Sequence, residues 1–221
     1  MFSFQLIEFL WTLHDDNELL EIRGNGKEVH CKTNGLQSIK TNMPIPREDK
    51  FYFEVLILNS GENGIVGVGI CRKNYPVNEM PGWGPLSIGY HSDDGGVFVE
   101  SRSQGITYYT NETFTTGDHI GILIDYSKST IKISKEEFQS KKKEVKKLQL
   151  KSHFMSKDLY PCVGFKDFNG GSLRLVAAKT GNQKFYLSKF PIAIEKFSYW
   201  AKGIFFFHLS KYSFFAPSYW F

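Results

Sequence analysis

A chain of 221 residues, of which 41% are hydrophobic and 23% charged, has the composition of a globular protein and not of a disordered one. Its net charge of +4 equals the charge of the lysine-rich run at 141–147, where five Lys outnumber one Glu. The rest of the chain is balanced, so no nucleic-acid partner is expected, and the length suits one large all-β domain.

The cysteines and histidines predict neither a metal site nor a cofactor. Cys31, Cys71 and Cys162 are far apart, odd in number and without a CxxC pair, which argues against a zinc site or a disulfide framework. The six histidines are scattered without metal-ligand spacing. Free thiols fit a reducing compartment, so we expect a cytoplasmic, and also nuclear, location.

The N-terminal segment 1–16 is apolar, but it does not have the pattern of a signal peptide. It lacks a basic residue before its apolar stretch, lacks a small-residue cleavage site, and contains Gln5 and Glu8. We expect a short helix or strand packed on the domain. Because no stretch of the chain has the roughly 18 uninterrupted apolar residues that cross a bilayer, no membrane span is expected.

Residues 17–180 show short runs of period two separated by turn dipeptides, which is typical of an all-β domain. Asn-Gly occurs at 25–26, 34–35, 63–64 and 169–170, and Asp-Gly at 94–95; both dipeptides suit tight turns. The clearest strand is 51–59, in which Phe53, Val55 and Ile57 share one face. The run 65–71 follows after a turn, and we predict that the two form a hairpin.

A second hairpin is predicted farther along. In the run 118–127, Ile120, Ile122 and Ile124 alternate with His119, Gly121, Leu123 and Asp125, and 130–134 repeats this alternation on the expected partner strand. Weaker strand candidates lie at 19–24, 28–32, 87–94, 160–166 and 172–178. Roughly ten strands without a long helical period predict a bent two-sheet antiparallel β-sandwich.

Two segments break this pattern. The polar, lysine-rich stretch within 136–155 is expected to be an insertion between strands, either a short helix or a solvated loop. Its lysines could contact RNA or acidic lipids, although such runs are more often solvated surface. The segment 181–221 is an aromatic-rich tail: residues 185–221 hold fifteen aromatic residues and one acid, with no period that would define a buried face.

Several motifs occur in the order seen in a known family. They are YFEVLILNSGENG at 52–64, VGVGIC at 66–71, MPGW at 80–83, SIGYHSDDG at 87–95, TFTTGDHIGILID at 113–125 and DLYPCVGF at 158–165. Together they resemble the SPRY (B30.2-like) domain, in the version found in Ran-binding proteins. The sequence departs from that pattern after 130–134, where SKEEF replaces the usual Lys-Asn-Gly turn, and after Leu175, where the aromatic-glycine ending is missing.

The candidates for catalytic chemistry are weak. The segment GVGICR at 67–72 begins like a dinucleotide-binding loop but lacks the third glycine, so its glycines are expected to allow close packing instead. Ser87 misses the nucleophile-elbow spacing because Pro85 occupies the first glycine position. The run from His91 to Asp94 could serve acid-base chemistry or hold a cation; the alternative is a hairpin turn in which at least one acid is structural.

The resemblance implies a non-enzymatic module that binds a protein or peptide through loops at one end of the sandwich, as a scaffold or substrate-recruiting subunit of a ubiquitin-ligase assembly. An RNA-associated or membrane-surface-associated protein is the alternative. Tyr75, Trp83 and Tyr90 are the predicted anchors, although Trp83 could instead plug the end of the core. Mapped onto this chain, the predicted ligand-binding residues are Arg72, Asn74, Tyr75, Pro81, Trp83, Tyr90, His91 and Asp93.

Overall fold

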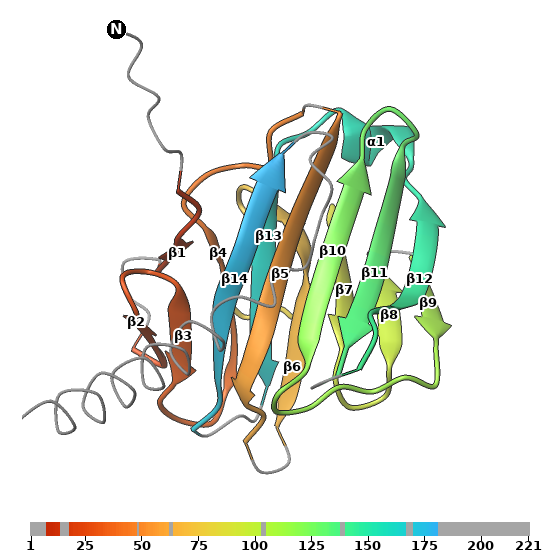
Figure 1. Ribbon diagram of the computed structural model, residues 1–221. Helices are drawn as coiled ribbons and strands as arrows, with labels where there is room; N and C mark the ends of the chain where they lie inside the picture. The colour runs from red at the N-terminus through yellow and green to blue at the C-terminus, as the bar shows by residue number, and fades with distance from the viewer. Residues whose placement is uncertain are drawn as a thin grey trace, which may run out of the picture. The chain divides into compact units, whose positions relative to one another are not determined.

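The computed structural model describes residues 8–13, 18–47, 49–61, 64–102, 105–137, 140–166 and 170–180. The predicted aromatic-rich tail at 181–221 lies outside these residues. The described part forms two antiparallel sheets of seven strands each, packed face to face (Figure 1). The predicted β-sandwich is therefore confirmed.

The first sheet, sheet A, carries the loops discussed below. Its strand order is β1 (Trp11–Thr12), β4 (Leu36–Thr41), β13 (Leu159–Lys166), β6 (Ile65–Arg72), β7 (Ser87–His91), β8 (Gly96–Val99) and β9 (Ile106–Tyr109). The order in sheet B is β12 (Lys143–Gln149), β11 (Thr130–Glu136), β10 (His119–Asp125), β5 (Lys50–Asn59), β14 (Ser172–Thr180), β3 (Glu28–Cys31) and β2 (Leu20–Arg23). One short helix, α1 (Ser152–Met155), follows β12 in the described chain.

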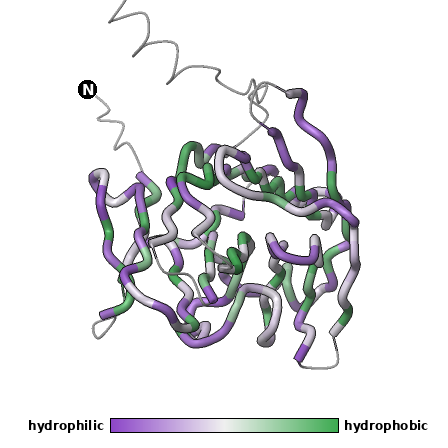
Figure 2. The backbone as a smooth tube through the Cα atoms, turned by 90° about the horizontal axis from the view of Figure 1, so that it is seen from below, coloured by the Kyte–Doolittle hydropathy of each residue, from purple (hydrophilic) through white to green (hydrophobic). Residues whose placement is uncertain are grey.

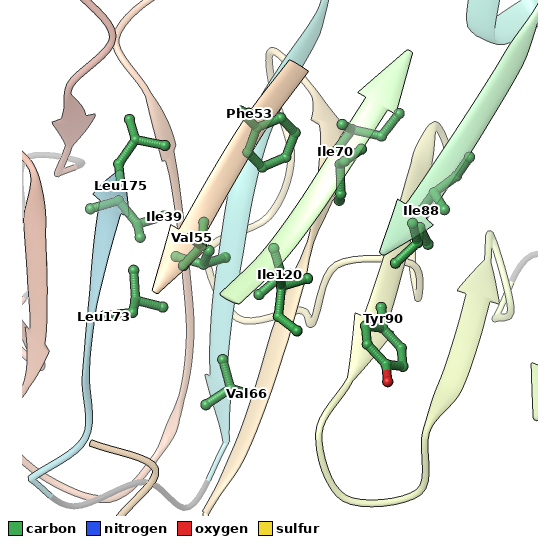
Figure 3. Packing of buried hydrophobic residues seen from close by; sticks show 14 of the residues in the cluster. Ile39, Phe53, Val55, Val66, Ile70, Ile88, Tyr90, Ile120, Leu173 and Leu175 are labelled. Atoms are coloured by element: carbon green, nitrogen blue, oxygen red, sulfur yellow. The ribbon is translucent and has the colours of Figure 1, made fainter. Parts of the chain in front are cut away.

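The core lies between the two sheets, where the inward residues of each strand meet. Figure 2 shows that hydrophobic and hydrophilic residues both occur along the described chain, and within the strands the residues of one face are the ones buried between the sheets. The six residues predicted to face inward are all at most 1% exposed, which confirms the predicted alternation: Phe53, Val55, Ile57, Ile120, Ile122 and Ile124. In Figure 3 the side chains of β5, β10 and β14 meet those of β4, β6 and β7.

The predicted pairing of β5 with β6 is wrong, because the two strands belong to different sheets. β5 lies between β10 and β14, whereas β6 lies between β13 and β7. Both strands have one continuous apolar face. A face of this kind can be buried in either sheet of a sandwich, so the apolar pattern does not determine which strands share a sheet. The predicted pairing of 118–127 with 130–134 is confirmed by the β10–β11 register, in which Ile122 lies opposite Ile133.

The insertion differs from the expected loop or helix over residues 143–149. This stretch is the strand β12, which pairs with β11 and forms the edge of sheet B. Its register with β11 shifts between Ile133 and Ser134, and Val145 and Leu148 pack against the core. Those two apolar residues anchor the strand, while its lysines remain at the surface. Within the insertion, the expected short helix is found as α1, in which Phe154 is buried.

The described part of the N-terminal segment packs on the domain as expected. β1 pairs with β4, placing Trp11 opposite Thr41, and the indole Nε1 of Trp11 donates a hydrogen bond to the carbonyl of Lys27 at 2.9 Å. The ring of Phe9 lies 5.1 Å from that of Phe51 in β5. These contacts extend the core beyond the region of family motifs.

Candidate functional site

The outer face of sheet A is built from small residues, and a loop lies directly on it. In β6, β7 and β13 the large apolar residues face the core, so the alternate positions Gly67, Gly89 and Gly164 face outward. A Cβ atom on Gly89 would lie 2.1 Å from the carbonyl oxygen of Pro81, and one on Gly164 would lie 2.6 Å from Pro81 Cδ. These glycines therefore let the loop 73–86 contact the sheet backbone, as expected for the glycines of β6.

Tyr75 fixes this loop from within. Its hydroxyl donates to the carbonyl of Met80 at 2.6 Å and accepts a hydrogen bond from the amide of Gly84 at 2.9 Å. The side chain is 5% exposed, and burial raises its pKa well above the ordinary value. The predicted role of Tyr75 as an exposed ligand anchor is thus corrected: its hydroxyl satisfies backbone groups of the loop, and its ring packs against Cys71, Tyr160 and Cys162.

His91 lies beneath the same loop. Its Nε2 atom is 2.8 Å from the carbonyl oxygen of Pro81, and because a carbonyl can only accept, Nε2 carries the proton. The side chain is 3% exposed, and burial lowers its pKa. His91 and the buried Pro81 therefore position the loop and do not meet a ligand directly, which corrects their predicted role.

Tyr90 points in the opposite direction, into the core between the sheets (Figure 3). It is fully buried, its ring lies 4.9 Å from that of Phe114, and its hydroxyl donates to the carbonyl of Glu112. A side chain in this position cannot touch a ligand on the surface, so the predicted anchor role of Tyr90 is also corrected. Its place follows from strand alternation, because Ser87, Gly89 and His91 occupy the outward positions of β7.

The turn after β7 contains two acids with different roles, Asp93 and Asp94. Asp94 Oδ1 accepts a hydrogen bond from the amide of Gly96 at 2.8 Å, and Gly95 adopts a positive φ of 66°. This is the structural acid expected of an Asp-Gly hairpin. Asp93 is exposed and remains a candidate contact residue.

Of the predicted ligand-binding residues, Trp83 is the one whose large apolar ring remains partly exposed. The guanidinium carbon of Arg102 lies 3.8 Å from the centre of its ring, and the amide of Arg102 donates to the carbonyl of Trp83 at 2.9 Å. A second backbone hydrogen bond, from Ser101 to Gly82 at 2.8 Å, ties the loop to the β8–β9 connection. The indole is therefore held in place by backbone contacts and by a cation–π contact.

Phe98 completes this surface. Its partly exposed ring lies 4.2 Å from that of His91, which in turn lies 6.1 Å from that of Trp83. We call the patch formed by Trp83, Phe98 and Arg102 the Trp83 surface. The sequence prediction did not include Phe98 and Arg102, although alternation in the run 96–99 places Phe98 opposite in direction to the core residue Val97.

Arg72 and Asn74 lie at the far end of the sheet from Asp93. β6 pairs with β7 so that Gly67 lies opposite His91, and Arg72 is five residues farther along β6. At the rise of an extended strand this separation is about 17 Å. The structure therefore does not gather the predicted site residues on one patch, and the loop 73–86 crosses the face between the two ends.

A cluster of titratable residues occupies the outer face of sheet B. The Glu54 carboxylate contacts His119 Nδ1 at 2.8 Å and accepts a hydrogen bond from the Tyr52 hydroxyl, and Lys142 Nζ donates to that hydroxyl at 2.6 Å. Burial alone would raise the pKa of Glu54, but the hydrogen bonds from His119 and Tyr52 outweigh it and hold that pKa below the usual range. The members satisfy one another, as a structural network does.

Within the described ranges, no group of three His, Cys, Asp or Glu side chains is placed to hold a metal ion. Among the same residues no helix is long and apolar enough to cross a membrane. What the described outer face of sheet A does present is a loop fixed on a rigid sheet, with an aromatic and arginine patch at its surface. This arrangement defines a β-sandwich domain that presents a loop-built surface.

Comparison with known proteins identifies the family. The model of the SPRY domain matches residues 50–179, and the chain belongs to the SPRY domain family. It is 38% identical over 126 residues to the Ran-binding proteins 9/10 homolog of Drosophila melanogaster, covering 54% of this chain and 13% of that protein. It is 31% identical over 199 residues to Ran-binding protein 9 of Xenopus laevis, covering 85% of this chain and 34% of that protein.

A solved structure supports the same family. The crystal structure of a human SPRY domain superposes with a TM-score of 0.54 at 25% identity, covering 72% of this chain and 94% of that domain. SPRY domains generally mediate protein–protein interactions. The chain spans about a third or less of the length of the two Ran-binding relatives.

Proposed function

We propose that this domain binds a protein ligand through the Trp83 surface and catalyses no reaction. The observation that carries the proposal is the partly exposed indole of Trp83, held under the guanidinium of Arg102 on a loop tied to the sheet by hydrogen bonds. Trp and Arg are enriched among the residues that dominate interface energy, and a side chain held in place before binding loses little entropy on binding.

Within the cell, the domain would act as a scaffold or substrate-recruiting part of a larger assembly, of the ubiquitin-ligase type. The support is indirect: the domain corresponds to a small part of much longer relatives, so a bound ligand would be brought to other domains. The relatives are named as Ran-binding proteins, and purified Ran is therefore a defined first partner to test.

The alternative of RNA or membrane binding through the lysine-rich strand has less support. Lys132 pairs with Glu144 at 2.9 Å, Lys143 pairs with Glu112, and Lys142 lies 4.2 Å from the centre of the Tyr52 ring. These contacts engage three of the lysines on or beside this strand with acids and an aromatic ring of the domain itself.

The test compares the partners of the full chain with those of two variants, Trp83→Ala and Arg102→Ala, by quantitative proximity labelling. Tyr109→Ala is the matched control, since it removes an exposed aromatic ring from the neighbouring strand β9. Specific partners should fall by about tenfold or more in both test variants and persist in the control. Unchanged labelling of folded Trp83→Ala and Arg102→Ala would rule out the Trp83 surface.

A further inference from the structure

The edge strands β9 of sheet A and β12 of sheet B lie on the same side of the sandwich (Figure 1), and an opening lies between them. In the described chain β9 pairs with β8 and β12 pairs with β11, and neither strand has a second partner strand. At one end of the opening His153 contacts Glu100 at 3.1 Å, and at the other end Lys143 pairs with Glu112. These two contacts join the sheets at the ends of the opening and leave its middle open.

The middle of the opening is an apolar cavity of about 140 Å³. It is lined from sheet A by Ile88, Val99, Ile106 and Tyr108, and from the β12–α1 segment by Leu148, Gln149, Leu150, Lys151 and Phe154. Ile106 is 48% exposed, so a large apolar side chain lies in contact with solvent at the mouth of the cavity. The lining therefore fits a large apolar side chain supplied from outside.

The rim of the cavity is positively charged on the β12 side. Lys146 Nζ lies 4.2 Å from the centre of the Tyr108 ring, so it spans the opening. Lys151 lines the cavity, whereas Lys147 lies opposite Lys132 of β11 and faces the outer side of sheet B; both are exposed and form no ion pair among the described residues. The acids nearest the two ends, Glu100 and Glu112, are already paired with His153 and Lys143. The free charge at the rim is thus cationic.

From these observations we infer a second interaction surface: an extended acidic segment of a partner protein adds to the open edge of β12. One of its large apolar side chains enters the cavity, and its carboxylates lie beside Lys146, Lys147 and Lys151. Edge strands accept such segments through main-chain hydrogen bonds, while pockets for alternate side chains provide specificity. A second copy of this chain fits less well, because its own β12 would place lysine opposite lysine.

The test uses fluorescence anisotropy with the full chain and three labelled peptides. The probe, EDELDFEDE, carries apolar residues at alternate positions between acids; KKKLKFKKK reverses the charge, and EDESDSEDE removes the apolar side chains. The probe should bind about tenfold or more tightly than either comparison peptide. Equal binding of all three, or no binding of the probe, would overturn the inference.

Matched variants locate the site. Ile106→Asp places a charge at the cavity mouth, and the double variant K146E/K147E reverses the charge on both faces of the edge strand β12; each should weaken probe binding by about tenfold or more. Tyr109→Asp makes the same kind of change on the opposite face of β9, and Lys32→Glu reverses an exposed charge at the end of β3. Both controls should bind within about twofold of the wild type, with melting curves establishing that all variants fold.

Two further measurements separate the remaining outcomes. Trp83→Ala should bind the probe normally, because this surface is independent of the Trp83 surface. If Trp83→Ala abolished probe binding while K146E/K147E did not, the peptide would be bound at the Trp83 surface and the inference would fail. Light scattering should show that Ile106→Asp and the wild type have the same mass; a wild-type dimer lost in Ile106→Asp would assign the opening to a second copy instead.

Discussion

Nε2 of His91 donates a hydrogen bond to the carbonyl oxygen of Pro81 across 2.8 Å, joining strand β7 to the loop that covers it. The bond needs a proton on Nε2, which a neutral ring in this tautomer supplies, and the ring lies where water cannot solvate a charge. Burial lowers the pKa of His91 despite the hydrogen bond to Pro81 and the charges of Asp93 and Asp94, which act in the opposite direction. The packing of the loop 73–86 over His91 is therefore sensitive to pH.

The first prediction is that acid destabilises the domain through His91. In the unfolded chain this histidine takes up a proton near its ordinary pKa of 6.5, whereas the folded chain resists protonation, so stability is lost as the pH falls below that value. The contribution is at most about 1.4 kcal/mol per pH unit. His91→Gln, whose amide can still donate to Pro81, should flatten the decline measured by urea unfolding between about pH 6.5 and about pH 5.5. An unchanged slope would contradict it.

The second prediction concerns Tyr75. Tyr75→Phe keeps the ring but leaves the buried amide of Gly84 without its acceptor and the carbonyl of Met80 with the amide of Trp83 alone, which should cost about 1–3 kcal/mol of unfolding free energy. Arg102→Ala, at an exposed position of the Trp83 surface, should change stability by about 0.5 kcal/mol or less. Denaturant titrations of both variants make the comparison, and a neutral Tyr75→Phe would argue that the hydroxyl does not hold the loop.

A third prediction separates two glycines under the loop. A methyl group on Gly89 meets the Pro81 backbone, which cannot yield, whereas one on Gly67 first meets the flexible end of Met80 at 2.9 Å. Gly89→Ala should therefore destabilise the domain by about 1–3 kcal/mol and displace the loop, and Gly67→Ala should cost clearly less. Unfolding curves together with amide-proton shifts of the loop 73–86 measure both effects; equal costs would show that loop contact is not what requires Gly89.

The fourth prediction concerns Glu54, whose folded-state pKa is held below the usual 4.5 by hydrogen bonds from His119 and Tyr52. A carboxyl with a depressed pKa stabilises the fold above its unfolded pKa, and that stabilisation is lost as the pH falls through the folded value. Glu54→Gln should lower stability by about 1–3 kcal/mol near neutral pH, and the difference from wild type should shrink below about pH 4.5. A difference that stayed constant with pH would contradict an ionised Glu54.

The sequence by itself determined the strands, their apolar faces and several turns. Period-two alternation identified the inward residues of β5 and β10, and Asp94-Gly95 identified the turn after β7. These features depend on neighbours within a few residues, since side chains of an extended strand alternate whatever the rest of the chain does. The ordered motifs from Tyr52 onward were enough to indicate the family.

Tertiary structure decided which strands pair and what lies over their outer faces. Alternation shows that β5 and β6 each have an apolar face, but it cannot show that the two strands belong to different sheets. It also cannot show that the loop 73–86 folds back over β7 and buries Tyr75 and His91, while Trp83 stays partly exposed beside Arg102. Exposure depends on segments distant in sequence, and so the surface available to a partner is a property of the assembled fold.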